Sequence, residues 1–255
     1  MMTAQQLDLV TRYQQLRRTG NELGLHIARQ IPKAIFDQGA RRLGLLRKDF
    51  LVLDTKEDEG ILIDFCLYDV RTEGKNFIEQ VAPALNPAPG SDQALFLEAM
   101  RQAHYSIFEV TGLEPGVGVQ VSDRLYGGNR LIVDAGLAGT ASVGNSFAAR
   151  LLACDDVTLT SGAILPLNAR WLEVLDVVIT QLAGEFQVRN LSHLDEAQRS
   201  ELSATIIYSA LSFGASRGAR FMPQPADGEH IMLGRQDACP CGSGQPFGAC
   251  CGRRG

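Results

Sequence analysis

The chain has 255 residues, 45% of them hydrophobic, and its 24 basic and 29 acidic residues give a formal net charge of -5 at pH 7. A chain of this length and composition can bury a substantial core, so an intrinsically disordered protein is not the expected class. The negative balance excludes a protein held on nucleic acid or on an anionic membrane by a global basic field.

The N-terminus carries no recognisable targeting signal. Residues 1–18 alternate apolar and polar side chains and lack the continuous apolar segment of a secretory signal. No later stretch approaches the roughly 18 consecutive apolar residues of a membrane-spanning helix. We therefore expect a soluble, cytoplasmic protein. In a reducing cytosol clustered cysteines are more often metal ligands than disulfides, and the isolated Cys66 and Cys154 are expected to be buried.

The fold class predicted from the sequence is α+β, beginning with a helical region over residues 1–85. Apolar residues recur at helical spacing before and after Pro32, which predicts two or three amphipathic helices within the first 48 residues. Helical character returns over residues 76–84.

A β-hairpin is predicted inside this first region. Residues 50–53 and 61–67 are apolar runs of strand-like length, and the polar segment 56–60 between them is typical of a turn. This interpretation places Asp64 on the second strand of the hairpin.

Residues 91–216 form the second predicted region. The breaker-rich residues 86–90 are its expected boundary with the first region. Ser91 or Asp92 can cap a helix that runs to about His104.

A small, mainly antiparallel β unit is predicted next. Apolar residues alternate over 117–121, and Gly127-Gly128-Asn129 provides a turn into residues 131–133. Further apolar runs at 147–152 and 157–165 predict additional strands.

Two helices complete this region. Asn168 can cap the first, and the second is predicted to begin near Ser192 with a capping box to Asp195. Glycines, prolines and charges over residues 217–233 then predict a flexible linker.

The tail, residues 234–255, contains four of the six cysteines, in the order Cys-Pro-Cys, eight residues, Cys-Cys. Zinc prefers four soft or borderline ligands in a tetrahedron, and the glycines between the cysteine pairs allow the backbone to bend around the ion. The predicted metal ligands are Cys239, Cys241, Cys250 and Cys251. Because all four positions come from the protein, the site would be structural rather than catalytic. Bound iron and a disulfide-bonded tail are the alternatives.

The segment from Gly234 to Gly252 resembles the SEC-C motif, which is found at the C-terminus of the translocase ATPase SecA and on many unrelated bacterial proteins. The resemblance rests on both cysteine spacings, the Pro-Cys-Gly-Ser-Gly core, the flanking Gly-Arg-x-Asp and the aromatic Phe247. It implies bound Zn²⁺ and a docking role, since in SecA the module recognises the chaperone SecB and has been linked to ribosome contact. The family loop usually carries several lysines between Gly244 and Cys250, where this chain has none. We therefore expect the metal to carry over and the SecB partnership not to.

The favoured hypothesis is a protein-interaction or adaptor role for the zinc tail, with a SecB-like chaperone, the ribosome or another protein as partner. Nucleic acid would be contacted only through a ribosome. The body, residues 1–216, resembles no characterised family and lacks the Gly-x-x-x-x-Gly-Lys-Ser/Thr phosphate loop of an ATPase. It could itself be a partner-binding scaffold.

An enzyme in the body is the alternative. Asp64 followed by Glu73-Gly74-Lys75 could supply the carboxylates and the lysine of a metal-dependent nuclease, although a charged surface is the better interpretation of these residues. Residues 214–218 spell Gly-x-Ser-x-Gly, but a helix is expected before them, so a glycine-terminated helix is the better interpretation. His230 could replace one cysteine as a zinc ligand.

Overall fold

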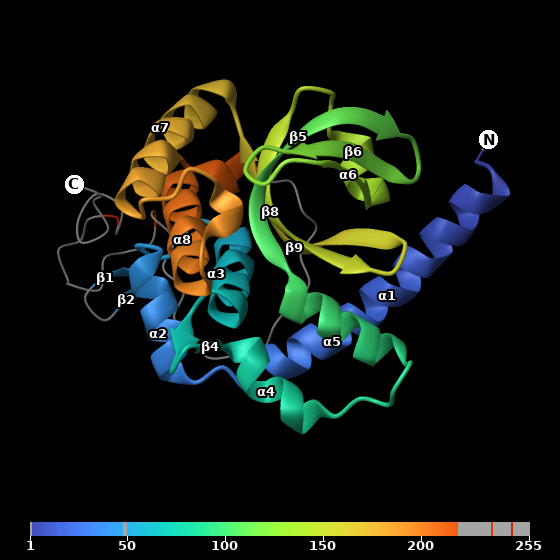
Figure 1. Ribbon diagram of the computed structural model, residues 1–255, viewed down its shortest axis with the longest axis horizontal. Helices are drawn as coiled ribbons and strands as arrows, with labels where there is room; N and C mark the ends of the chain where they lie inside the picture. The colour runs from blue at the N-terminus through green and yellow to red at the C-terminus, as the bar shows by residue number, and fades with distance from the viewer. Residues whose placement is uncertain (1, 48–49, 219–235, 237–245, 247–255) are drawn as a thin grey trace.

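The computed structural model describes residues 2–47 and 50–218, together with Gln236 and Pro246. Within these ranges the chain forms a β-barrel with helices packed against it (Figure 1). The α+β class is confirmed. The predicted linker beyond residue 218 and the tail, apart from Gln236 and Pro246, lie outside the described residues.

Two helices occupy the N-terminal segment, as predicted. Helix α1 spans Ala4–Ala28 and is capped by Thr3, whose side chain accepts a hydrogen bond from the amide of Gln6. Helix α2 spans Lys33–Arg42 and begins after Pro32, whose fixed φ and lack of an amide proton suit the start of a helix.

The predicted hairpin over residues 50–67 is wrong, because the chain there forms helix α3, Lys56–Tyr68. Thr55 and Asp58 form a capping box, with the Asp58 carboxylate 3.1 Å from the Thr55 amide. The acidic segment 56–60, which the sequence analysis assigned to a hairpin turn, forms the first turn of this helix, where negative charge is favourable. The following apolar run is continuous because most of the helix surface is buried, and such a run does not distinguish a buried strand from a buried helix.

Two short hairpins flank α3. Strand β2, Phe50–Leu51, pairs with β1, Leu46–Arg47, rather than with residues 61–67. Strands β3, Arg71–Thr72, and β4, Lys75–Asn76, form the second hairpin.

Helix α4, Phe77–Leu85, confirms the helical prediction over residues 76–84. Helix α5, Asp92–Gln102, is capped by the Ser91 side chain as expected. The boundary proposed at residues 86–90 stays a prediction, although the larger hydrophobic core draws residues from both sides of it.

Five strands form a closed barrel in the order β5-β6-β7-β9-β8. Their bounds are His104–Glu114 for β5, Gly118–Asp123 for β6, Asn129–Val133 for β7, Ser146–Cys154 for β8 and Val157–Leu167 for β9. All pairs are antiparallel except β7 with β9, which confirms a mainly antiparallel unit. The sequence analysis did not identify β5.

The barrel has Greek-key connectivity. Strands β5, β6 and β7 follow one another, β8 returns beside β5, and β9 closes the gap between β7 and β8. Helix α6, Ala135–Thr140, connects β7 to β8 and packs against the barrel core. A five-stranded Greek-key barrel is the architecture of the OB-fold.

A separate hydrophobic cluster fills the barrel interior. It includes Phe108 and Phe147, whose ring centroids lie 5.8 Å apart, with Val119 and Val121 from β6 and Ile132 from β7. Because side chains fill this space, the barrel is a packed core rather than a ligand cavity.

Helices α7, Ala169–Glu185, and α8, Glu196–Phe213, pack against each other. Asn168 caps α7 as predicted. The predicted start of the second helix near Ser192 is wrong, because Ser192 lies in a 3₁₀ turn and Asp195 is the cap, through its own capping box with Gln198.

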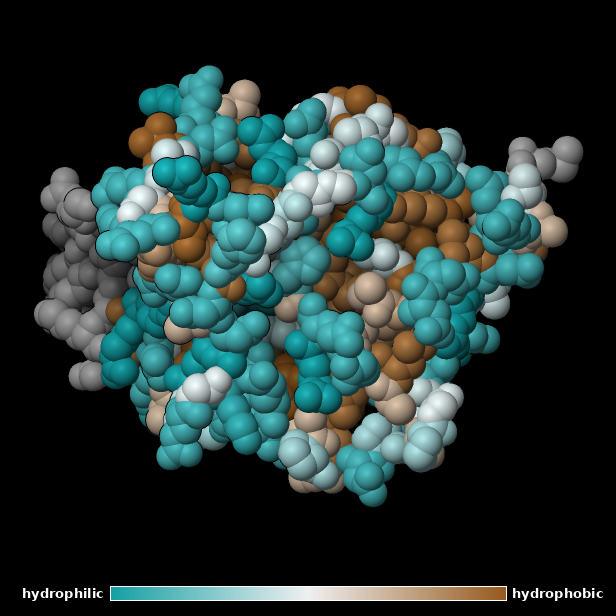
Figure 2. Space-filling view, viewed as in Figure 1, coloured by the Kyte–Doolittle hydropathy of each residue, from teal (hydrophilic) through white to brown (hydrophobic). Residues whose placement is uncertain are grey.

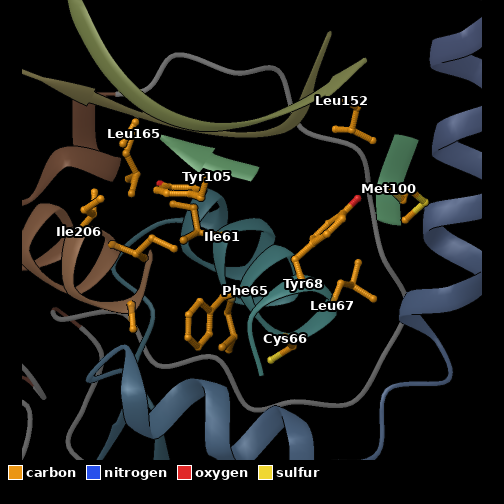
Figure 3. Packing of buried hydrophobic residues seen from close by; sticks show 14 of the residues in the cluster. Ile61, Phe65, Cys66, Leu67, Tyr68, Met100, Tyr105, Leu152, Leu165 and Ile206 are labelled. Carbon is orange, nitrogen blue, oxygen red and sulfur yellow. The ribbon is translucent and has the colours of Figure 1, made fainter. Parts of the chain in front are cut away.

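Helix α3 lies between the barrel and the helices of the body and provides much of the larger core. Figure 3 shows Ile61, Phe65 and Tyr68 on this helix, with Tyr105 on the barrel side and Ile206 on α8. The residues at the centre of α3 therefore connect two layers that are far apart in sequence.

No helix in the described ranges is long and apolar enough to cross a membrane. Hydrophilic residues cover most of the face seen in Figure 2, and the hydrophobic residues that are visible gather mainly over the barrel.

We predict that Gly118→Ala destabilises the protein by about 2 kcal/mol. A methyl group at this position would lie 1.9 Å from the Ile132 carbonyl oxygen, so β6 and β7 would have to separate. Gly60→Ala is the control, because its methyl group would meet nothing within 4 Å and alanine favours the helix. Urea unfolding followed by fluorescence of the single tryptophan, Trp171, measures both; equal stability of the two variants would contradict the prediction.

Candidate functional site

The predicted zinc ligands, Cys239, Cys241, Cys250 and Cys251, lie outside the described residues, as does His230. As a donor set, four thiols fit zinc, which binds thiolate sulfur well and accepts a tetrahedron. The other two cysteines, Cys66 and Cys154, are buried and unpaired, as expected. In the part of the chain that the structure describes, no group of three or more histidine, cysteine or acidic side chains could hold a metal ion.

The residues proposed for a nuclease do not form a metal centre. Asp64 lies on α3 rather than on a strand, is buried, and its Oδ2 lies 3.0 Å from the Nε of Arg150. Glu73 and Lys75 are exposed on the β3–β4 hairpin, where Glu73 adopts a left-handed turn conformation. The carboxylate that would bind Mg²⁺ is therefore already paired with a guanidinium.

The Gly-x-Ser-x-Gly segment is a helix end, as predicted. Gly214 ends α8 with φ 81°, a left-handed conformation that glycine adopts easily. Ser216 is buried in the 3₁₀ turn Ala215–Gly218 that follows. A nucleophile elbow would need a strand before the serine and an exposed hydroxyl.

The principal polar cluster of the body surrounds Arg150, which points outward from strand β8. Its guanidinium is 3% exposed and forms ion pairs with two carboxylates, Asp64 on α3 and Asp69 at the end of α3. It also lies over the rings of Tyr68 and Tyr105, 4.3 and 5.4 Å from their centroids. One buried cation therefore links the barrel to the helical layer.

Helix α8 extends this cluster. The Ser200 hydroxyl donates to the carbonyl of Asp69 and accepts from Nη1 of Arg42 at 2.9 Å. Nη2 of Arg42 lies 2.7 Å from Glu201. The cluster thus joins α2, α3, α8 and the barrel through charged and hydrogen-bonded groups.

Burial controls the ionisation of this cluster. It raises the pKa of Asp69 from 3.8 to about 6, against the opposing effect of Arg150. Burial also raises the pKa of the Tyr68 and Tyr105 phenols, so both remain protonated hydrogen-bond donors at neutral pH.

A second buried carboxylate, Asp123 at the end of β6, holds His104 at the start of β5. The Ser106 hydroxyl and the amides of Leu125 and Tyr126 donate to its Oδ1, and Nε2 of His104 lies 3.4 Å from its Oδ2. Burial alone would raise the pKa of Asp123, but these partners outweigh burial and lower it. The carboxylate therefore stays ionised and orients the imidazole.

A pocket of about 170 Å³ opens between these two clusters. Its wall includes Tyr68 and Asp69 from α3, His104 and Tyr105 from β5, Tyr126 from the β6–β7 loop and Arg199 from α8. Pockets in which several groups with shifted pKa values converge are frequent functional sites.

A family model described as "Family of unknown function (DUF7986)" matches residues 7–187, more than half of the chain. The chain belongs to the DUF7986 family. The SEC-C motif model matches residues 235–253, which confirms that resemblance and encloses all four tail cysteines.

A 67-residue stretch is 30% identical to protein translocase subunit SecA of Clostridium acetobutylicum. The stretch covers 26% of this chain and 8% of that SecA, so the chain spans a small fraction of the relative's length. No solved structure matches the chain.

The DUF7986 match contains the barrel, Arg150, both of its α3 carboxylates and the His104–Asp123 pair, whereas Arg199 lies beyond its last residue. Sequence reasoning singled out Asp64, but as a metal ligand, and it did not find Arg150, Asp69 or the His104–Asp123 pair. Arg150 did carry a signal, because it is a charged residue inside the apolar run 147–152, where a buried charge requires partners. Nothing in the sequence identified the partners, which lie more than 80 positions away.

We predict that Asp69→Asn changes the pH dependence of stability. Because the folded-state pKa of Asp69 lies above 3.8, the folded protein binds more protons than the unfolded protein between about pH 4 and 6, and the stability contributed by this group is lost as the pH rises through that window. Asparagine does not titrate. The wild type should therefore lose on the order of 3 kcal/mol relative to the variant across this window.

Urea unfolding at several pH values measures this difference. The same substitution at the exposed Asp8 on α1 is the control. Parallel stability profiles for wild type and Asp69→Asn would contradict the prediction.

Proposed function

We propose that this protein binds zinc through its SEC-C tail and that the loaded tail binds a protein partner in the cytoplasm. The observation that carries the proposal is the SEC-C match over residues 235–253, which contains Cys239, Cys241, Cys250 and Cys251. Four thiolates complete a tetrahedron around zinc and leave no position for water or substrate. The tail's role is therefore recognition rather than catalysis.

Zinc binding would also fold the tail. The segment 235–253 has almost no hydrophobic residues with which to form a core. Structural zinc sites contribute roughly 10 to 16 kcal/mol to such segments, enough to order the chain around the ion. Partner binding should then depend on the metal, because only the loaded tail has a fixed surface.

The partner we favour is a protein, which could be a SecB-like chaperone, the ribosome or another protein. The similarity to a translocase subunit supports a protein partner in general terms. Between Gly244 and Cys250 this chain carries no lysine, so it would make fewer charge contacts with an acidic partner than the usual family loop. We therefore expect weaker SecB binding than for a lysine-rich SEC-C module.

We predict about one zinc ion per chain by elemental analysis of protein purified without added metal. Cys250→Ser should lose most of it, because serine is a poor zinc ligand and three thiolates bind less tightly than four. Cys154→Ala is the matched control, since it removes a cysteine that is buried in β8 and should retain the zinc. Equal zinc content in all three proteins would refute the metal assignment, and iron in place of zinc would change the cofactor.

Partner binding is tested with purified SecB and purified ribosomes, followed by capture from a cell extract. The wild type and Cys154→Ala should retain the same partner, and Cys250→Ser and a chain that ends at residue 233 should lose it. If all four proteins capture the same set, the tail is not an interaction module. If only the shortened chain loses the partner, binding does not require the metal.

A further inference from the structure

The pocket between α3, α8 and the start of β5 is of a size that fits a small ion or group. Its volume is about 170 Å³. One water molecule occupies about 30 Å³ in the liquid, so the pocket holds roughly five or six waters. It is smaller than the roughly 300 Å³ or more of pockets that enclose drug-sized ligands. Phosphate, or the carboxylate end of a small metabolite, fits this space.

The carboxylates that line the pocket already have partners. Asp69 is paired with Arg150, and Glu79 accepts from Arg71 at 3.1 Å and from the amide of Asn76 at 2.8 Å. These pairs neutralise most of the negative charge in the wall. The groups that remain available are therefore mainly donors.

Arg199 is a fixed cation with one available nitrogen. Its Nε donates to the carbonyl of Leu194 at 3.0 Å and its Nη2 to the carbonyl of Ser192 at 3.4 Å, which hold the guanidinium in place. Its Nη1 lies 3.9 Å from Glu196, whose side chain is 64% exposed. An exposed pair of this kind contributes little, so an anion can take the place of Glu196 at small cost.

Tyr126 contributes a hydroxyl-bearing side chain to the wall of the same pocket. Within the described ranges the hydroxyl has no hydrogen-bond partner, and Arg199 is the charge that acts on it most strongly. Burial raises the pKa of Tyr126, so the phenol stays protonated and can donate. Its ring packs against His104 in a T-shaped arrangement with the ring centroids 5.4 Å apart, and Asp123 holds His104 in turn.

We propose that this pocket binds a small ligand through an anionic carboxylate or phosphate group, with Arg199 and Tyr126 as its principal contacts. Two donors that the surrounding protein already holds in place bind an anion without first having to be ordered. Ordering side chains is a large part of the free-energy cost of binding, so this arrangement favours the anion. The site belongs to the body of the protein. Its ligand is therefore independent of the metal and the partner of the tail.

The test is isothermal titration of the full-length, zinc-loaded protein with inorganic phosphate and, separately, with succinate, at constant ionic strength. Saturable binding of one anion per chain is expected for at least one of the two, and the tighter anion identifies the chemistry of the natural ligand. Tyr126→Phe keeps the ring against His104 and should weaken binding about tenfold, because it removes a hydrogen bond to a charged group. Arg199→Gln should weaken it at least as much.

Arg130→Gln is the matched control, because Arg130 is an exposed arginine on β7 outside the pocket wall. It should bind the anion as the wild type does. If Arg199→Gln fails to fold because it loses the contacts to Ser192 and Leu194, the conservative Tyr126→Phe decides the question.

Four results would overturn the proposal. The first is that neither anion binds saturably. The second is that Tyr126→Phe binds as tightly as the wild type, and the third is that Arg130→Gln weakens binding as much as Tyr126→Phe does. The fourth is that binding disappears in Cys250→Ser, which would place the anion on the tail.

Discussion

The guanidinium of Arg150 lies between the carboxylates of Asp64 and Asp69, and this buried contact joins the barrel to the helices. Removing such a charge from water costs several kcal/mol, which attraction and hydrogen bonds must offset. Two carboxylates and two tyrosine rings surround the cation, and Ser200 fixes the backbone at Asp69 from α8. A buried charge tolerates few alternative packings, so we infer that the cluster specifies how the two layers dock.

The same cluster shapes the pocket. Burial raises the pKa of Asp69, Arg150 opposes this effect, and the neighbouring charge of Asp64 adds to it. Asp123, which holds the pocket-lining His104, has several donors and a lowered pKa. The pocket wall therefore contains a carboxyl group whose pKa is raised to about 6, and a histidine held by a carboxylate that stays ionised. Different roles for like groups are a common feature of functional sites.

Local signals predicted much of the body. Caps at Ser91 and Asn168 and the turn at Gly127-Gly128 appear where the sequence indicated, because a cap or turn depends on neighbouring residues alone. The prediction of a hairpin over residues 50–67 was wrong because the conformation of this segment depends on tertiary packing rather than on neighbouring residues. An apolar run records burial, and whether a strand or a helix is buried depends on the surrounding layers, here the barrel on one side and α8 on the other.

By itself the sequence determined the SEC-C identity of the tail and predicted its four-thiol donor set, because closely spaced cysteines can indicate a ligand set without knowledge of the fold. Only the tertiary structure decided that β5 to β9 close into a barrel, that Asp64 pairs with Arg150 rather than with a metal, and that Arg199 and Tyr126 line one pocket. These arrangements bring together residues that are tens of positions apart in the sequence. Their geometry depends on how whole layers pack, and the spacing of residues along the chain does not predict that packing.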